Sequence, residues 1–319
     1  MGKDYRTIAS AICRSVILLG VLVHGIASSA LADESADGLF NKPFANFGAG
    51  FEYINYSEKL FLSGKKVDAR IKVFNPTQTS SGYIPLSSRT GLYLSGSKTL
   101  ATIADSETWS AEGIGAIQQD DTKFSWVEVD AMAVYHLKPG HMVVGGINYT
   151  ALNFSRFSFR PAAGTDAFNT ALGFGTLSQW VAAGNDPVKF PGLNPNAGQG
   201  TITEDNNSLV AMVGYQYDTF FIIRNSPFRF FGGVKAGLPL FYMVENSTFP
   251  ETTLIGTVGS GYDFGANIGM GWSFTKELSL LGSVDYTYKH RSRITSGNIF
   301  APESDLFSIL PAIKLNWAF

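Results

Sequence analysis

Two residues near the end of the chain have the types and spacing of a hydroxyl nucleophile and its base. His290 and Ser292 stand two positions apart in the stretch KHRSR (289–293). Because alternate residues of a β-strand point to the same side, an extended backbone here places both side chains on one face. A histidine beside a serine can take the hydroxyl proton and activate the oxygen for attack. The sequence therefore contains one candidate catalytic pair.

The surroundings of this pair favour a structural role. The pair resembles the His-x-Ser element that outer-membrane phospholipases carry on the barrel exterior, and the resemblance is limited to these two positions. Lys289, Arg291 and Arg293 replace the polar, amide-rich surroundings of that family, and no orienting asparagine can be assigned. A cationic strand end that meets anionic lipid headgroups or a loop explains the same residues. We keep a phospholipase-like enzyme as the alternative interpretation.

Other reactive side chains form no catalytic set. Outer-membrane proteases use acidic pairs and an Asp/His couple at the outer rim, and the adjacent Asp120 and Asp121 are the closest match. Neighbouring strand residues point to opposite faces, and neither aspartate has an identifiable histidine partner, so we expect a solvated turn. His136 and His141 flank the turn KPGH and are expected at a polar rim. We predict no catalytic residues, no metal and no cofactor.

The N-terminal segment 1–32 predicts export. Three basic residues precede a short apolar run over 15–26, and Ala30-Leu31-Ala32 fits the small-residue cleavage pattern of signal peptides. Cleavage after Ala32 leaves a mature chain of residues 33–319. The single cysteine lies within the signal, which excludes disulfide bonds and thiolate metal sites from the mature chain.

Composition restricts the class of protein further. The signal contains three of the 24 Lys and Arg and one of the 26 Asp and Glu, so the mature chain has 21 against 25 and a net charge of −4. This balance argues against a nucleic-acid partner. Charged residues make up 16%, below the roughly 25% of soluble domains. No apolar stretch after the signal is long enough for a spanning helix, which leaves a closed β-barrel as the way to cross a membrane.

Alternating hydrophobicity supports the barrel. In YDFGANIGMGWSF (262–274), one face has aromatic rings at both ends and apolar residues between them, and the other face has small and polar residues. The same pattern predicts that Tyr242 faces lipid in the stretch 228–244. Ten antiparallel strands follow from this pattern: 44–56, 91–103, 109–118, 124–137, 142–157, 208–223, 228–244, 262–274, 278–292 and 305–319. Eight or twelve strands remain alternatives, because 67–75 could form a further strand or extend the first hairpin.

Turn lengths predict the orientation of this up-and-down barrel. Short turns at 104–107, 138–141, 224–227 and 275–277 are expected in the periplasm. The external side receives the long loops, above all 57–90 and 158–207, together with one brief connection at 118–122.

The last strand connects the chain to a known class. SILPAIKLNWAF alternates apolar and polar residues and ends on an aromatic ring. It resembles the final strand of bacterial outer-membrane β-barrel proteins. The resemblance implies an outer-membrane location, outer-membrane lipids as neighbours, and Trp317 and Phe319 as a signal to the barrel assembly machinery. A secreted soluble β-sandwich also has alternating strands and is the competing fold, although its strands would be shorter.

The alternation also selects the residues that face the lumen. These carry both signs of charge: Glu52, Glu128, Asp130, Asp218, Arg229, Lys235, Asp263, Asp285, Lys289, Arg291 and Lys314. Buried charges need partners or water, and ten strands enclose an interior far narrower than that of large porins. We expect an integral outer-membrane surface protein that is not an enzyme and has a narrow or closed lumen. Passage would be limited to small solutes, and a closed structural or adhesive barrel is the alternative; the oligomeric state stays open.

Overall fold

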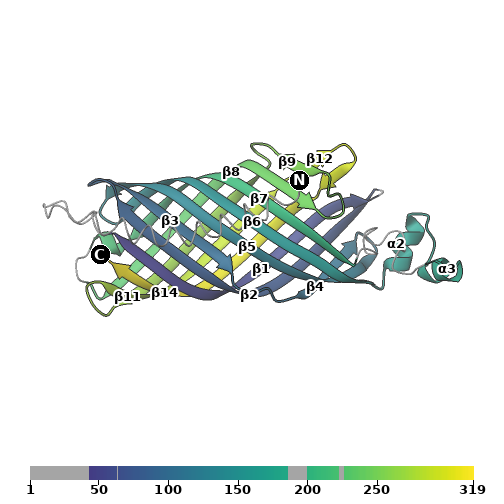
Figure 1. Cartoon of the computed structure of the whole chain (residues 1–319), viewed down its shortest axis with the longest axis horizontal. Helices are drawn as coiled ribbons and strands as arrows, with labels where there is room; N and C mark the ends of the chain where they lie inside the picture. Colours follow the sequence, from purple (N-terminus) through teal and green to yellow (C-terminus); the bar gives the residue numbers. More distant parts are fainter. Residues whose placement is uncertain (1–42, 63, 186–199, 223–225) are drawn as a thin grey trace.

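The computed structural model describes residues 43–62, 64–185, 200–222 and 226–319, and these form one closed antiparallel barrel (Figure 1). The predicted signal and its cleavage site lie outside the described residues. Eleven strands occupy ten positions around the ring, because β3 and β4 share one position between β2 and β5. In ring order the strands are β1 (Phe44–Leu62), β14 (Glu303–Ala318), β11 (Leu278–Arg291), β10 (Gly261–Ser273), β8 (Phe228–Asn246), β7 (Thr201–Asp218), β6 (His141–Pro161), β5 (Gly115–Lys138), β3 (Thr90–Thr99) with β4 (Asp105–Ala111), and β2 (Lys65–Pro85), which pairs with β1.

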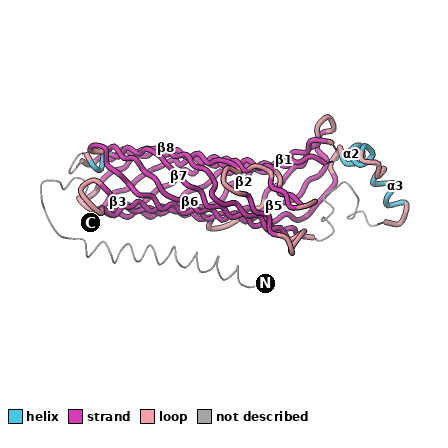
Figure 2. Tube along the Cα trace, turned by 90° about the horizontal axis from the view of Figure 1, so that it is seen from above, coloured by secondary structure: helices cyan, strands magenta, loops and turns pink. Residues whose placement is uncertain are grey.

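The barrel is elongated and its two ends differ (Figures 1 and 2). The end that carries the C-terminus, here the turn end, has the short connections 86–89, 139–140 and 274–277 and the connection 219–227 with η3 (Thr219–Phe221). The opposite end, here the loop end, has the short turn 112–114 and also the longer connections 162–200, 247–260 and 292–302. These contain α2 (Thr165–Ala171), α3 (Leu177–Ala182), β9 (Thr253–Gly256), β12 (Ile294–Ser296) and β13 (Ile299–Ala301). Neither described helix is long and apolar enough to span a membrane.

The predicted external loop at 57–90 is wrong. The structure places β1 up to Leu62 and β2 from Lys65 to Pro85 there, in register over their whole length. The outward residues of this hairpin turn polar beyond the apolar region, with Ser57, Lys59 and Arg70 among them. In sequence, these polar residues resemble a loop, but they belong to strands of the barrel wall that extend beyond the membrane into water.

Two predicted turns are also wrong. The segments 91–103 and 109–118 were expected to be separate strands joined at 104–107, whereas the structure has one interrupted strand, β3 and β4, with the break at 100–104. The predicted outer connection at 118–122 lies within β5. Its polar residues alternate between a buried inner side and the outer surface, which explains why composition alone suggested a turn. The total of ten positions agrees with the prediction, but β2 replaces one of the expected strands.

The break in the third strand is closed by a side chain from its neighbour. Asn75 on β2 is fully buried, and its Nδ2 donates to the carbonyl of Phe124 on β5 at 2.8 Å. Its Oδ1 accepts from the backbone N–H of Ile103 at 3.0 Å. Since β2 and β5 flank the missing ladder, the amide of Asn75 replaces hydrogen bonds that an uninterrupted strand would supply.

A belt of outward apolar side chains surrounds the half of the barrel nearer the turn end. Ile268 and Met270 on β10 are 69% and 62% exposed, which requires lipid rather than water around them. The spanning segments defined by this belt are 45–53, 74–84, 92–98, 127–137, 143–151, 209–217, 228–241, 262–272, 278–288 and 307–317. This confirms the predicted transmembrane barrel.

One outward prediction differs. Tyr242 is buried in the interior, because a register shift between Leu209 and Val210 opposite Leu240 inserts an extra residue into β8 and reverses its alternation.

The interior is filled in layers. Toward the turn end, an apolar layer contains Phe44, Tyr83, Met132, Val134, Met142, Val144, Val210, Met212, Phe221 and Ala318. Toward the loop end, a second one contains Ile54, Tyr56, Ile71, Val73, Phe124, Trp126, Leu152, Phe154 and Leu306. Inward residues between them along β5 are Glu128 and Asp130, so a charged layer separates the two apolar layers.

Candidate functional site

The structure places all eleven predicted lumen residues on the inner side of the wall. Nine are buried, and Lys235 and Asp285 remain partly accessible from inside, with side chains 25% and 31% exposed. Five cations and six anions make up this set. All of them except Glu52 contact an opposite charge inside the barrel, which is the condition under which charges are tolerated there.

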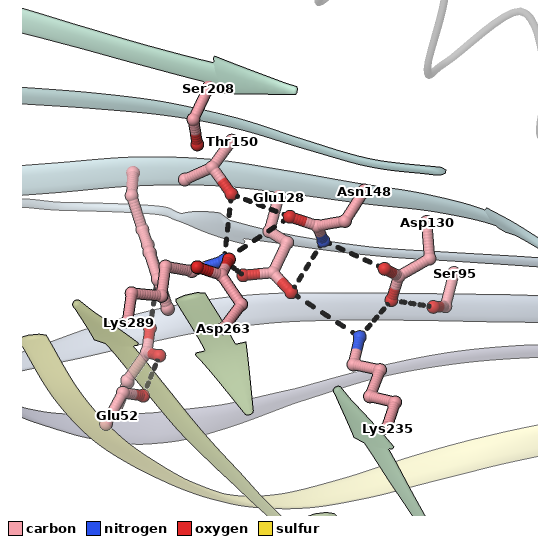
Figure 3. A network of polar contacts seen from close by, with 12 residues as sticks. Glu52, Ser95, Glu128, Asp130, Asn148, Thr150, Ser208, Lys235, Asp263 and Lys289 are labelled. Carbon is pink, nitrogen blue, oxygen red and sulfur yellow. Dashed lines mark hydrogen bonds and ion pairs between the residues drawn. The ribbon is translucent and has the colours of Figure 1, made fainter. Parts of the chain in front are cut away.

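The centre of this charged layer joins opposite walls (Figure 3). Lys289 on β11 approaches Glu128 on β5 and Asp263 on β10, both at 3.1 Å. Lys235 on β8 contacts Asp130 on β5 at 2.6 Å. Asn148 on β6 donates to both Glu128 (3.0 Å) and Asp130 (2.8 Å). The Lys289–Glu128 and Lys235–Asp130 pairs join strands that are not neighbours in the ring, so they tie the barrel together across its lumen.

The remaining predicted residues form smaller pairs around this centre. Arg291 contacts Asp263, and Lys314 lies 3.2 Å from Asp285. Nearer the turn end, Arg229 forms a 2.6 Å ion pair with Asp218, and its guanidinium lies 4.5 Å from the ring centre of Phe44.

Glu52 differs from the other lumen carboxylates in its partners. Neutral donors hold it: Trp126 through Nε1 at 2.8 Å, Thr77 at 3.2 Å and Ser308. These hydrogen bonds satisfy the carboxylate without an adjacent cation.

A cavity of about 150 Å³ lies between the charged layer and the apolar layer of the turn end. Its lining combines Met132 and Met142 with Asp130, Lys235 and Lys314. This volume is enough for several water molecules, and the polar side chains supply their hydrogen bonds. Layers of buried side chains fill the barrel on both sides of the cavity, so the geometry suits enclosed water rather than an open channel.

A second charged layer lies at the loop end, beyond the spanning segments, and the sequence analysis missed it. Arg156 on β6 is 4% exposed and contacts Glu58 on β1 at 2.9 Å and Glu107 on β4 at 2.5 Å. Asp120 is fully buried beside them and accepts from Trp109 Nε1 and Thr122 Oγ1, both at 2.9 Å. Its burial corrects the predicted solvated turn.

Buried carboxylates outnumber the cation in this layer. Burial and the neighbouring Glu107 raise the pKa of Asp120 to about 8. Burial and Glu58 raise the pKa of Glu204 to about 7, against the opposing effect of Arg156. At neutral pH both groups therefore hold protons for a large part of the time.

The signal for this layer was present in the alternation. Arg156 is in phase with Asn148 and Thr150 on β6, and Glu58 is in phase with Glu52 on β1. Continuing the period of two past the apolar belt would have placed both residues inside the barrel. The predicted strand 142–157 included Arg156, but its inward phase was not followed beyond the belt, and Glu58 fell in the predicted loop 57–90.

The candidate catalytic histidine faces outward at the edge of the belt. His290 Nδ1 lies 2.8 Å from Asp305 Oδ1, and Asp305 also accepts from Tyr288 at 2.7 Å and Lys59 at 2.9 Å. Partial burial opposes ionisation of Asp305, but the bonds from Lys59, His290 and Tyr288 prevail and lower its pKa to about 2. The side-chain partner of His290 is Asp305 rather than Ser292, so the sequence pair is not assembled as a nucleophile and base.

This outward cluster has the elements of a cation site. Ligand atoms of His290, Glu303 and Asp305 lie within 4.8 Å of one another. The ammonium of Lys59 already occupies the space between the two carboxylates, at 2.8 Å from Glu303 and 2.9 Å from Asp305. A metal ion would have to displace it.

The other singled-out residues lie near the turn end. His136 is buried against Tyr83, whose hydroxyl is 2.8 Å from its Nε2, which corrects the predicted polar rim; His141 packs at 5.0 Å between ring centres from Tyr217. Trp317 is exposed on the belt and stacks with Phe319, with ring centres 6.2 Å apart. Their role as an assembly signal stays a prediction.

Solved structures share this architecture. The outer membrane protease OmpT from Escherichia coli is similar with a TM-score of 0.61 and 12% identity, over 91% of this chain and 100% of that one. The outer membrane protein OprG from Pseudomonas aeruginosa gives a TM-score of 0.34 at 11% identity, over 89% of this chain and 99% of that one. The translocator domain of autotransporter NalP from Neisseria meningitidis gives 0.33 at 9% identity, over 97% and 98%. No protein-family model and no curated protein matches the sequence.

Fold, belt and ring together define the class. The chain has the architecture of bacterial outer-membrane β-barrel proteins, as the resemblance of its last strand implied. At 12% identity the likeness to the protease shows a shared fold alone.

Proposed function

We propose that the protein is an integral outer-membrane barrel with a sealed lumen, and that its working surface is the loop end, displayed outside the cell. The observation that supports this is the filled interior. Two apolar layers enclose a charged layer in which the Lys289–Glu128 and Lys235–Asp130 pairs cross the interior. A solute would have to separate those pairs and displace buried rings such as Phe124 and Phe154.

The proposal includes no catalytic step. A protease of Asp/His type would need a histidine inside the rim of the loop end. After residue 32 the chain has three histidines, all within the described part, and His136 and His141 lie near the turn end. His290 faces outward and is paired with Asp305. Binding of another molecule by the loop end is the role that fits these placements best.

Single-channel recording tests the sealed lumen. The purified protein in planar bilayers should give no conductance steps, whereas a sixteen-stranded porin in the same membrane gives the control signal. Stable steps from the wild-type protein would overturn the proposal. Phospholipid hydrolysis by the wild type that disappears in His290→Ala would overturn the non-enzymatic part separately.

A further inference from the structure

One part of the lipid-facing surface is polar. On β2, Gln78 and Ser80 point outward in the middle of the spanning segment, while Thr77 and Ser81 on either side point inward to Glu52 and Asn46. In register with them on β3 are Lys98, opposite Gln78, and Gly96, opposite Ser80. The other eight ring positions present apolar residues, glycine or tyrosine along their spanning segments, all of which lie in the described part of the chain.

Hydrocarbon is a poor environment for this patch. The amide of Gln78 has two donors and an acceptor, and lipid tails can satisfy none of them. Lys98 lies at the outer end of its segment, where its ammonium can extend toward headgroups. Gln78 lies deeper. Along the outer face of β2 it is three positions from Ile84 and two from Phe74, which are the ends of the spanning segment. Its side chain is too short to bring the amide to the headgroups. Polar side chains at that depth are found where they meet a protein partner.

The shape of the patch permits close approach. Gly82 and Gly96 carry no side chains, and a Cβ added at Gly96 would lie 3.1 Å from the carbonyl of Glu128. Large rings border the patch: Phe47 is 63% exposed on β1, and Phe51 stacks on Phe74 with ring centres 5.5 Å apart. The result is a shallow polar centre with an apolar rim, the arrangement of small and polar residues that packs one membrane segment against another.

The exposed surface continues above the belt. The third strand leaves the wall at the break directly after β3, and there Leu100 and Ile103 are 56% and 52% exposed. These side chains lie on the same side of the barrel as the patch, because β3 and β4 share one ring position. Apolar surface outside the belt faces water unless a partner covers it.

We propose that the face formed by β1, β2 and β3 is a dimer interface, and that its occupant is a second copy of this chain. Two copies in one membrane are related by a two-fold axis along the membrane normal, which puts Gln78 of both at the same depth. An amide is complementary to itself, so the two Gln78 side chains satisfy each other with a pair of hydrogen bonds. The inference rests on the proposed membrane-embedded barrel.

Cysteine cross-linking tests the interface, because the chain after residue 32 contains no cysteine. Ser80→Cys should form a disulfide-linked dimer in native membranes upon mild oxidation. Ala236→Cys, outward on β8 at the opposite side of the ring, is the matched control and should give at least tenfold less dimer. Equal yields, no product, or a product of another mass would each overturn the inference; the last would indicate a different protein partner.

A second variant tests the amide itself. Gln78→Leu should lower the dimer yield of Ser80→Cys at least tenfold, whereas Val234→Leu on β8 should leave it unchanged. An unchanged yield in Gln78→Leu contradicts the role of the amide. Heat-modifiable migration of the wild-type protein in detergent gels monitors folding of the barrel. If the protein inserts but stays monomeric, only the dimer proposal is overturned. If it does not insert, the proposed function is overturned as well.

Discussion

Arg156 holds together groups that would otherwise repel one another. Its guanidinium contacts Glu58 and Glu107 from two different strands, and Asp120 and Glu204 are buried nearby. The ring of Phe154 also lies 4.4 Å from its charged centre. Water is excluded here, so the charges on the buried carboxylates are compensated mainly by the guanidinium of Arg156.

Replacing Arg156 with methionine should therefore cost about 3–5 kcal/mol in the free energy of unfolding, since it leaves buried carboxylates without a partner. Arg160 on the same strand is the matched control. It contacts Asp121 at 3.0 Å with both side chains well exposed, so Arg160→Met should cost about 0–1 kcal/mol. Urea unfolding in lipid vesicles measures both values. Similar costs for the two variants would refute the dependence on Arg156.

The raised pKa values of Asp120 and Glu204 predict a pH dependence. Their folded pKa values, about 8 and about 7, lie above the ordinary values of unfolded carboxyls. The stabilising contribution is thus fully present below about pH 4 and is lost as pH rises through 7 and 8. The midpoint of thermal unfolding should fall across this range.

Substitution at Asp120 isolates its part of this effect. Asp120→Asn keeps an acceptor for Trp109 and removes the titration, so its unfolding midpoint should vary less with pH than that of the wild type. Asp121→Asn, which alters an outward side chain, should follow the wild-type curve. Parallel curves for all three proteins would show that Asp120 does not titrate in the folded state as proposed.

At the scale of elements, the interrupted third strand is the weakest part of the wall. Between Thr99 and Asp105 the backbone bond from the Leu100 N–H to the Pro76 carbonyl (2.9 Å) is followed by a gap in the ladder, where the amide of Asn75 supplies the connection. A barrel is stable when every backbone group has a partner, and the side chain of Asn75 supplies two such partners here.

Asn75→Ala should loosen this break. It leaves the Phe124 carbonyl and the Ile103 N–H unpaired, which costs about 1–3 kcal/mol, and amide exchange of residues 98–106 should accelerate. Asn55→Ala, on the outer surface of β1, is the control and should change neither quantity. Unaltered exchange in Asn75→Ala would mean that other contacts hold the break closed.

The same elements show how far sequence reasoning reaches. Alternation predicted β8, β10, β11 and β14 to within two residues at each end, because lipid on one side and a polar interior on the other give each residue a distinct environment. It failed for β2 and β4, because both faces of these strands carry polar residues, such as Arg70 and Glu107. Without a contrast in polarity between the two faces, the segments were predicted as a loop and a turn. The bulge at Leu240 could not be foreseen either, since an extra residue leaves no mark in composition.

At the scale of the whole molecule, strand alternation alone predicted which residues face the lumen. The structure shows in addition which of these residues contact one another. Lys289 and Glu128 are 161 positions apart in the chain, and only the closure of the ring brings them within 3.1 Å. Such a pair cannot be predicted from alternation, because its formation depends on the tilt and stagger of the strands as well as on the face that each residue occupies. The apolar layers escaped prediction for another reason: an inward Phe124 or Phe154 resembles a lipid-facing ring.

The strands of the barrel are longer than the apolar belt is wide, so the loop end stands above the membrane. In β5 the 12 residues from 115 to 126 stand beyond the spanning segment. At ~3.3 Å per residue and a tilt of about 40°, they raise the strand tips by roughly 30 Å. The helices α2 and α3 are mounted on that stiff pedestal, with Phe174 and Val181 uncovered. If the loop end faces outward as proposed, this height keeps the two helices clear of the lipid headgroups and their sugars, where a large molecule can reach them.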